Sequence, residues 1–533
     1  MVNNRLKRVL EIPYGYKISQ SKETMSRVFK REAANAKNYR DWKEAALAYD
    51  ERRGLEQWKQ VDKSRRYDYT YIRARLEQLR ILRRSKDDPG LMFNLNEGIH
   101  GNLSGMGRPA LYQKAKFGTK QLIVDYVEEI ASALEHLAKP NLKGISAQER
   151  IEFFHRAHLC FGQSALLFSG SGTFVFFHIG VLKALWQEDL IPSVVSGTSG
   201  GALIAAAAGT RPNDQLGEIF DSKFLSFEEE ISAILSSIGR GRRKKLPQHY
   251  LQNIIDRVVP DVTFAEAYQI SGLKINISIA PAEKHQKARL LNAITSPNVL
   301  VRDAVLASCS IPGVFAPTAL AARDINGERV PYLPGRKWID GSLSDDLPMK
   351  RLARLYGINH FIVSQTNPMV LPFIGAEKGG QSVLGMLSQT GLKTAKDWGV
   401  AASHILRQPF SQDSYPSRAL DGYISILSQT YTGDINILPS GRFLNPAKAL
   451  SARSTEEVMQ MVSEGERSTW PMMERIRIQT HISRTLNRLL EDLDQSMFKI
   501  NRTVVLPKRI AVNKKTKHAP ESKKKRPTKK LAK

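Results

Sequence analysis

Hydrophobic positions divide the chain into a helical first part and an alternating second part. Residues 38–84 contain few glycines and many Ala, Glu, Leu, Lys and Arg, which are good helix formers. Ile72, Leu76 and Leu79 recur at helical spacing and predict one apolar helix face. We therefore expect residues 1–150 to form a helical N-terminal extension.

Short apolar runs alternate with helical segments from residue 164 to about residue 357. The segments between the runs predict helices over 175–186 and 202–208. The runs themselves predict buried strands, which lie at 165–168, 191–196, 273–280 and 360–364. Because strands that alternate with helices usually form a mostly parallel sheet covered on both faces, we predict an α/β domain over residues 164–357.

The hydrophobic pattern of the C-terminal third is less regular. We expect residues 358–500 to complete the α/β core with mixed and helical structure, including a helix over 456–497 and a loop region over 409–445. Residues 501–533 are rich in lysine and lack a hydrophobic period. This composition predicts a disordered basic tail.

The 533 residues carry a formal net charge of +27. Such a basic balance is typical of proteins that meet a polyanion, either nucleic acid or an anionic membrane face, and also of a well-solvated surface. Arg73, Arg75, Arg80 and Arg84 lie mostly off the apolar helix face and predict either a solvated face or a membrane-facing one. We expect anionic membrane contact and no specific nucleic acid, since no zinc spacing, RNA-binding motif or clear helix-turn-helix occurs.

The N-terminal residues lack the apolar stretch and the cleavage site of a secretory signal. No run of about 18 uninterrupted apolar residues occurs, so we expect no transmembrane helix and only peripheral membrane contact. Cys160 and Cys309 are too few for a disulfide framework or a Cys-based metal site. We predict both to be reduced core residues of a cytoplasmic protein.

The segment Gly197-Thr198-Ser199-Gly200-Gly201 carries the strongest chemical signal. It follows an apolar strand and precedes a helix of small residues, which is the context of a nucleophile elbow. Neighbours two positions from the serine crowd such a turn, so glycine is needed at both places. The N–H groups at the helix start favour negative charge that develops near the serine.

Two further motifs flank this elbow. Residues 169–173 (SGSGT) link the first predicted strand to the next helix, and backbone N–H groups in such a loop can form an oxyanion hole. The loop is not a Walker loop, because the Gly-Lys-Ser/Thr ending is missing. Asp340 lies between the apolar pair Trp338-Ile339 and Gly341, which indicates either a carboxylate at a strand end or an ordinary Asp-Gly turn.

In order and spacing, the GSGT loop, the GTSGG elbow and the later Asp-Gly pair resemble the patatin-like phospholipases. Residues 308–315 (SCSIPGVF) also resemble the segment that precedes the aspartate in that family. Further similarity, at residues 111–126, 177–181 and 429–435, is to the branch of triacylglycerol lipases known from yeast lipid droplets. The resemblance covers about residues 38–440.

The resemblance implies a catalytic dyad without histidine, in which Ser199 is the nucleophile and Asp340 is the base. It implies lipid acyl hydrolysis without metal or cofactor, on triacylglycerol or phospholipid at a membrane or lipid-droplet surface. The resemblance does not decide between triacylglycerol and phospholipid as the substrate. It also leaves the oligomeric state open. The oxyanion hole is expected from the amides of Gly170, Ser171, Gly172 and Thr173.

The chain departs from the branch at two positions of this motif. Ser171 replaces the middle one of three glycines, and Val175 stands where another glycine is frequent. Because Ser171 keeps its backbone N–H, we expect an oxyanion hole of altered shape. No histidine is followed by Asp at the spacing of the His-x4-Asp motif, which disfavours acyl transfer.

Three alternative functions and one surface segment remain to be tested. His360 or His404 would complete a Ser-His-Asp triad if the chain were an α/β-hydrolase. The net charge and the tail would suit a nucleic-acid-binding protein. The changes in the glycine loop would suit a non-catalytic scaffold. Residues 227–245 join an amphipathic stretch to a basic run and predict a lid or interfacial anchor, or an ordinary surface helix.

Overall fold

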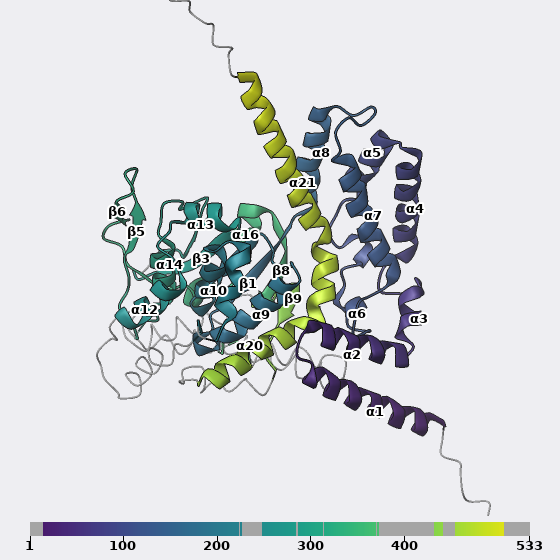
Figure 1. The fold of residues 1–533 in the computed structure, drawn as a ribbon, viewed down its shortest axis with the longest axis horizontal. Coiled ribbons are helices and arrows are strands. Elements are labelled where there is room, and N and C mark those ends of the chain that lie inside the picture. Colours follow the sequence, from purple (N-terminus) through teal and green to yellow (C-terminus); the bar gives the residue numbers. More distant parts are fainter. Residues whose placement is uncertain are drawn as a thin grey trace, which may run out of the picture.

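A layer of helices from the N-terminal part of the chain lies beside an α/β core (Figure 1). The computed structural model describes residues 14–222, 224–225, 248–283, 286–312, 314–368, 370–371, 431–440 and 454–505. The predicted lid, His404 and most of the Lys-rich tail lie outside these residues.

The helical layer begins where asparagine and aspartate side chains cap helix N-termini. Asn38, Asp68 and Asp87 each accept a hydrogen bond from a backbone N–H three residues later. Gly54 starts a new helix with φ 64°, so residues 38–84 form separate helices rather than one. The helices are α1 (Tyr14–Asn35), α2 (Tyr39–Arg52), α3 (Leu55–Gln60), α4 (Tyr69–Ser85), α5 (Asp88–Gly98), α6 (Pro109–Tyr112), α7 (Gln121–Leu137) and α8 (Ala147–Phe161), with the 3-10 turn η1 (Leu103–Gly105) between α5 and α6.

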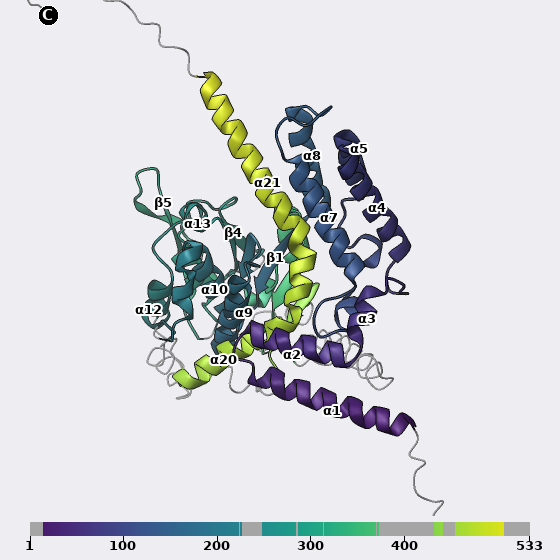
Figure 2. The same cartoon turned by 45° about the vertical axis from the view of Figure 1, so that its right-hand side comes forward.

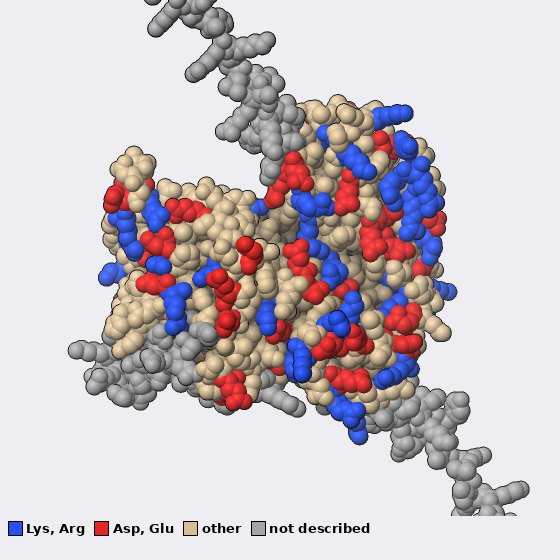
Figure 3. All heavy atoms as spheres, in the orientation of Figure 1, with Lys and Arg blue, Asp and Glu red and all other residues tan. Residues whose placement is uncertain are grey.

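The arginines of α4 have two different environments. Lys and Arg side chains gather over the outer side of α4 in Figure 3. Arg73 pairs with Asp62 and Arg83 pairs with Glu129, so this side is a network of ion pairs. Arg75 is buried instead, with Nη2 donating to the Asn94 carbonyl at 2.7 Å, and its assignment to a solvated or membrane-facing surface was wrong.

A mostly parallel sheet forms the centre of the α/β core. Its strand order is β4-β3-β2-β1-β8-β9, and β7 pairs with β3. The pairs β3–β2, β2–β1, β1–β8 and β8–β9 are parallel, whereas β4 and β7 run antiparallel to β3. The strands are β1 (Gln163–Phe168), β2 (Val194–Gly197), β3 (Lys274–Pro281), β4 (Arg289–Asn292), β7 (Trp338–Asp340), β8 (Ile358–Ser364) and β9 (Ile435–Ile437).

Alternate residues of the sheet pack against different helices. Leu166 and Phe168 belong to the large core cluster that also holds side chains of α9, α10 and α14. Ala165 and Leu167 face a smaller cluster with α16. The sheet is therefore covered on both faces, as predicted. The remaining core elements are α9 (Val175–Gln187), α10 (Gly200–Gly209), α12 (His249–Val258), α13 (Phe264–Ser271), α14 (Val301–Ser308), α15 (Ser342–Asp345), α16 (Met349–Tyr356), the 3-10 helices η2 (Gly172–Phe174) and η3 (Asn213–Phe220), and the hairpin β5 (Leu320–Arg323) and β6 (Arg329–Tyr332).

The C-terminal helices join the helical layer to the core. Helix α20 (Thr455–Thr469) packs on α9, and η7 (Trp470–Met472) leads into α21 (Met473–Val505). In Figures 1 and 2, α21 runs between the N-terminal helices and the sheet. Its start belongs to the large core cluster through Met473 and Ile476, and its later turns belong to the N-terminal cluster through Ile482 and Leu486. One helix thus contributes to two hydrophobic cores.

Several details differ from the prediction. Cys160 is exposed on α8, so only Cys309 is a core cysteine. Strand β9 lies inside the predicted loop region 409–445. Helix α21 continues to Val505, so residues 501–505 of the expected disordered tail are helical. Over the described part of the chain, none of the helices combines the length and apolar character that crossing a bilayer requires.

Candidate active site

Ser199 occupies a strained turn between β2 and α10. Its backbone has φ 54° and ψ −126°, a conformation that costs about 1–3 kcal/mol for a residue with a Cβ. The Ser199 N–H donates to the Ser308 hydroxyl at 2.9 Å, and that hydroxyl donates to the Ser278 carbonyl at 2.8 Å. The turn is therefore held by a buried chain of polar groups that reaches β3.

Backbone atoms close to Gly197 and Gly201 leave no room for a side chain at either position. A Cβ on Gly197 would lie 2.1 Å from the Gly201 carbonyl oxygen. A Cβ on Gly201 would lie 2.3 Å from the Phe168 carbonyl oxygen. Both distances are far below normal contact, and main-chain atoms move less readily than side chains do. The glycine spacing of the motif thus follows from the close approach of the turn to the end of β1.

The sheet register brings Asp340 to the same turn. Strand β3 pairs Ile277 with Gly197 of β2 and, two residues further on, pairs Ile279 with Asp340 of β7. Strand β4 pairs with both Ile277 and Ile279, so it occupies the other edge of β3. Strand β7 therefore pairs with β3 on the same side as β2, beyond the point where β2 ends at the turn. This pairing places Asp340 beside the residues that follow β2.

The Ser199 hydroxyl lies close enough to the Asp340 carboxylate to lower the pKa of that carboxyl through hydrogen bonding. The carboxylate also accepts a hydrogen bond from the Ser342 N–H at 2.9 Å. Both Ser199 and Asp340 are buried, with 7% and 2% of their surface exposed. Burial raises the pKa of Asp340 against the lowering effect of these hydrogen bonds. The result is a carboxylate that both lies close to the serine hydroxyl and is a stronger base than an exposed aspartate.

An apolar cavity of about 170 Å³ opens beside Ser199. Val175, Leu203 and Phe315 are among the side chains that line it, together with Gly172 of the glycine loop. Among the described residues that line this cavity, none carries a charge. Its chemistry suits a hydrocarbon chain that ends at the serine hydroxyl.

The N–H groups of the glycine loop are not equally available for an oxyanion hole. The Gly170 N–H donates to the Asp346 carboxylate at 2.7 Å, which withdraws this amide from the expected oxyanion set. Gly172 and Thr173 line the cavity of Ser199. The Ser171 hydroxyl lies over the start of α10, where a Cβ on Gly200 would approach it to 2.2 Å. The substitution of glycine by serine in this loop is thus accommodated by a glycine in the elbow.

Asp346 links the glycine loop to the elbow, and sequence reasoning missed it. Besides the Gly170 amide, its carboxylate accepts from Asn367 Nδ2 at 3.0 Å, and its carbonyl accepts from the Thr198 hydroxyl at 2.8 Å. Burial raises the pKa of Asp346 to about 7 despite the bonds from Asn367 and Gly170. Because Gly170 and Asp346 lie 176 positions apart in the chain, no local pattern could connect them.

The histidines do not form a triad in the described structure. His360 is hydrogen-bonded to Ser164 and Gln479 near the N-terminal ends of β1 and β8. Ser164 precedes the end of β1 by four residues, about 13 Å along the strand, so His360 lies at the other end of the sheet from Ser199. His178 is fully buried between Ser364 and the Ser169 carbonyl, and burial lowers its pKa to about 3. It is a neutral support of the glycine loop.

A strained serine beside a buried aspartate, with a glycine loop one strand earlier, is the arrangement expected of a patatin-like α/β protein. Residues 166–353 match the family described as Patatin-like phospholipase, and residues 19–159 match Domain of unknown function (DUF3336). The chain therefore combines a patatin-like domain with an N-terminal domain whose family description names no function.

Full-length relatives agree with these matches. Triacylglycerol lipase ptl3 of Schizosaccharomyces pombe is 32% identical over 82% of this chain and 91% of that protein. Triacylglycerol lipase ptl2 of the same yeast is 31% identical over 85% of this chain and 74% of that protein. Triacylglycerol lipase 4 of Saccharomyces cerevisiae is 34% identical over 82% of this chain, and the match spans 50% of that longer protein. The chain belongs to the patatin-like phospholipase family.

Proposed function

We propose that the protein is a serine lipid acyl-hydrolase in which Ser199 and Asp340 form the catalytic dyad. The proximity of the buried Asp340 carboxylate to Ser199, whose backbone is strained at the turn, is the observation that carries the proposal. The family and the names of the relatives support ester hydrolysis on lipids. The alternative of a Ser-His-Asp triad through His360 loses its support, because the His360 side chain lies at the opposite end of the sheet from Ser199.

The reaction follows from the position of the two side chains. Ser199 Oγ attacks the ester carbonyl carbon while its proton passes to Asp340. The tetrahedral oxyanion takes hydrogen bonds from amides of the glycine loop, of which Gly172 and Thr173 line the cavity. Collapse of this intermediate expels the alcohol, which recovers the proton from Asp340. Asp340 then removes a proton from water, which attacks the acyl-enzyme carbonyl. Collapse of the second tetrahedral intermediate releases the fatty acid, and Asp340 returns the proton to Ser199 Oγ.

The apolar cavity favours a long acyl chain as the part of the substrate that enters the protein. Triacylglycerol and phospholipid both offer such a chain, and the names of the relatives favour triacylglycerol. Water-insoluble substrates require contact with a lipid surface, so we place the protein peripherally on a membrane or lipid droplet in the cytoplasm. Surface arginines, such as those of α4, would contribute to contact with an anionic face.

The test compares fatty-acid release by the wild type and by Ser199→Ala from triolein and from anionic phospholipid emulsions. We expect release from triolein that falls by at least about a thousandfold in the variant, since removal of the nucleophile abolishes the covalent route. Faster release from phospholipid would change the assigned substrate. Equal release by the variant would refute the dyad, and folded wild type without release from either lipid would favour a scaffold.

A further inference from the structure

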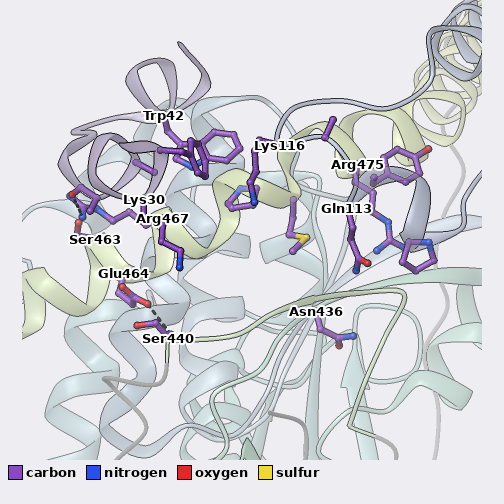
Figure 4. Close-up of a pocket in the computed structure, with 18 of the residues that line it drawn as sticks. Lys30, Trp42, Gln113, Lys116, Asn436, Ser440, Ser463, Glu464, Arg467 and Arg475 are labelled. Carbon is purple, nitrogen blue, oxygen red and sulfur yellow. Dashed lines mark hydrogen bonds between the residues drawn. The ribbon is translucent and has the colours of Figure 1, made fainter. Parts of the chain in front are cut away.

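A second cavity, of about 1050 Å³, lies between the N-terminal helices and the α/β core. None of the described residues that line it also lines the cavity of Ser199. Its walls come from α1, α2 and the residues around α6 on one side, and from α20, η7, α21 and the β9 region on the other (Figure 4). The space thus lies where residues of the DUF3336 match meet the part of the chain beyond the patatin match.

Positive charge predominates among the described residues that line this cavity. Lys30, Lys116, Arg467 and Arg475 carry the positive charge. In the view of Figure 4, Lys30 and Arg467 lie toward one end, Arg475 toward the other, and Lys116 between them. Across the described residues, none of these four side chains forms an ion pair with a carboxylate.

The two carboxylates that line the cavity have backbone partners. Asp434 accepts from the Phe361 N–H at 2.8 Å, and Glu464 accepts from the Ser440 N–H at 2.8 Å. Arg467 also turns to the backbone, donating to the Ala34 and Ala36 carbonyls. Asp434 offsets part of the charge of Arg475, whereas Lys30 and Lys116 have no carboxylate partner within the described chain. Four cations against two carboxylates leave the described lining with a net positive charge.

Arg475 is the central observation, because its guanidinium is buried. The residue is 8% exposed, and Nε donates to Gln479 at 3.2 Å, while the guanidinium lies 5.8 Å from the centre of the Tyr112 ring. Burial lowers its pKa, which reflects the cost of holding this charge away from water. The charge of Asp434, which lines the same cavity, opposes this lowering only in part. A buried charge is normally paired, so a buried arginine that is partly neutralised and opens into a cavity with more cations than carboxylates can accept an anion.

Apolar side chains accompany the cations. Phe29, Trp42, Pro471 and Met472 line the same space, and the Lys116 ammonium lies 5.3 Å from the centre of the Phe29 ring. A planar guanidinium fits carboxylate and phosphate oxygens, whereas the aromatic and aliphatic walls fit a hydrocarbon chain. The cavity volume of about 1050 Å³ lies just above the range of about 300–1,000 Å³ that ligand pockets usually occupy.

We propose that this cavity is a second lipid site, which binds an amphiphile with a carboxylate or phosphate head against Arg475 and Lys116 and its chain against Trp42 and Met472. The inference goes beyond the proposed hydrolysis, because it concerns binding at a place remote from Ser199. It gives the N-terminal domain a role in lipid recognition. A fatty-acid anion and a phosphate-headed lipid share this chemistry, and the experiment separates them.

The experiment uses the full chain with Ser199→Ala, so that turnover plays no part. A photoreactive fatty acid is crosslinked to the protein, and the labelled peptides are mapped by mass spectrometry. We expect label on peptides that contain Trp42 or Met472, displaced by oleate or by lysophosphatidic acid and not by oleyl alcohol at the same concentration. The stronger of the two competitors identifies the head group, and inorganic phosphate as a competitor tests whether the head binds without the chain.

Matched variants test the two cations. Arg475→Gln should weaken binding about tenfold, and Lys116→Ala about threefold, since the first removes a buried charge-assisted bond and the second an exposed charge. Arg488→Gln on the same helix and Lys114→Ala on the same loop lie outside the cavity and should change binding less than twofold. If Arg475→Gln does not fold, as judged by circular dichroism, the pair Lys116→Ala and Lys114→Ala decides. Label confined to the Ser199 cavity, equal displacement by oleyl alcohol, or unchanged binding in both cation variants would overturn the proposal.

Discussion

Replacing Asp346 with alanine removes the group that joins the glycine loop to the elbow. The Gly170 amide would lose its acceptor at 2.7 Å, and Asn367 would lose its acceptor at 3.0 Å. A buried donor left without a partner costs about 1–3 kcal/mol. The loop then gains freedom to leave the geometry in which its other amides face the cavity.

The size of the effect on catalysis follows from the same range. If the whole cost appears in the transition state, which relies on the loop for its oxyanion, kcat falls roughly 5- to 150-fold at 1.36 kcal/mol for each factor of ten. Asp346→Asn keeps an oxygen that accepts from Gly170, so its kcat should stay within about tenfold of the wild type. The ratio between the two variants therefore measures the hydrogen bond rather than the loss of volume.

A pH profile separates the charge of Asp346 from its shape. Its pKa is raised to about 7, so the carboxylate gains charge as pH rises through that value and then accepts more strongly from Gly170. Wild-type kcat on a soluble short-chain ester should rise in a step near pH 7, and Asp346→Asn should lack this step. Folding is monitored in parallel by denaturant unfolding. A fully active, stable Asp346→Ala enzyme would refute the role given to this residue.

Three further outcomes are expected. Gly201→Ala should destabilise the protein by at least about 1–3 kcal/mol in denaturant unfolding and abolish activity, because its Cβ would lie 2.3 Å from the Phe168 carbonyl, and wild-type stability would contradict this packing. His360→Ala should retain kcat within about threefold while unfolding more easily, because it loses bonds to Ser164 and Gln479 far from Ser199, and a loss above a hundredfold would restore the triad. In the wild type, kcat/KM should rise with pH through the pKa of Asp340, which is raised above its ordinary value of 3.8, because only the ionised carboxylate accepts the serine proton. A kcat/KM that does not change with pH above pH 4 would contradict this.

The elbow could be predicted from sequence because its constraint is local. Gly197 is required by a contact within one strand-turn-helix unit, and Gly201 by a contact with the end of β1. The strand-turn-helix unit is visible in the order of apolar and small residues. Strands β1, β2, β3 and β8 were equally visible, since each is a short buried run. Asp340 needed the family resemblance, because its partner Ser199 lies on another strand and the two meet only through the register of β3.

Features set by tertiary contacts escaped prediction. Strand β9 has three residues, Ile435–Ile437, and is a strand only because β8 lies beside it. Arg75 reads as a surface residue by spacing, yet Asn94 and Tyr126 from other helices provide the hydrogen bonds that allow its burial. In each case the deciding neighbour is remote in the chain.

The central claim is that Ser199 is a nucleophile activated by Asp340. Its most direct test is labelling of the purified protein with a fluorophosphonate, which reacts covalently with an activated serine, followed by peptide mapping. We expect one adduct, on the peptide that contains Ser199, and a labelling rate at least about a hundredfold lower in Asp340→Asn. Labelling at another serine, or an unchanged rate in Asp340→Asn, would contradict the dyad.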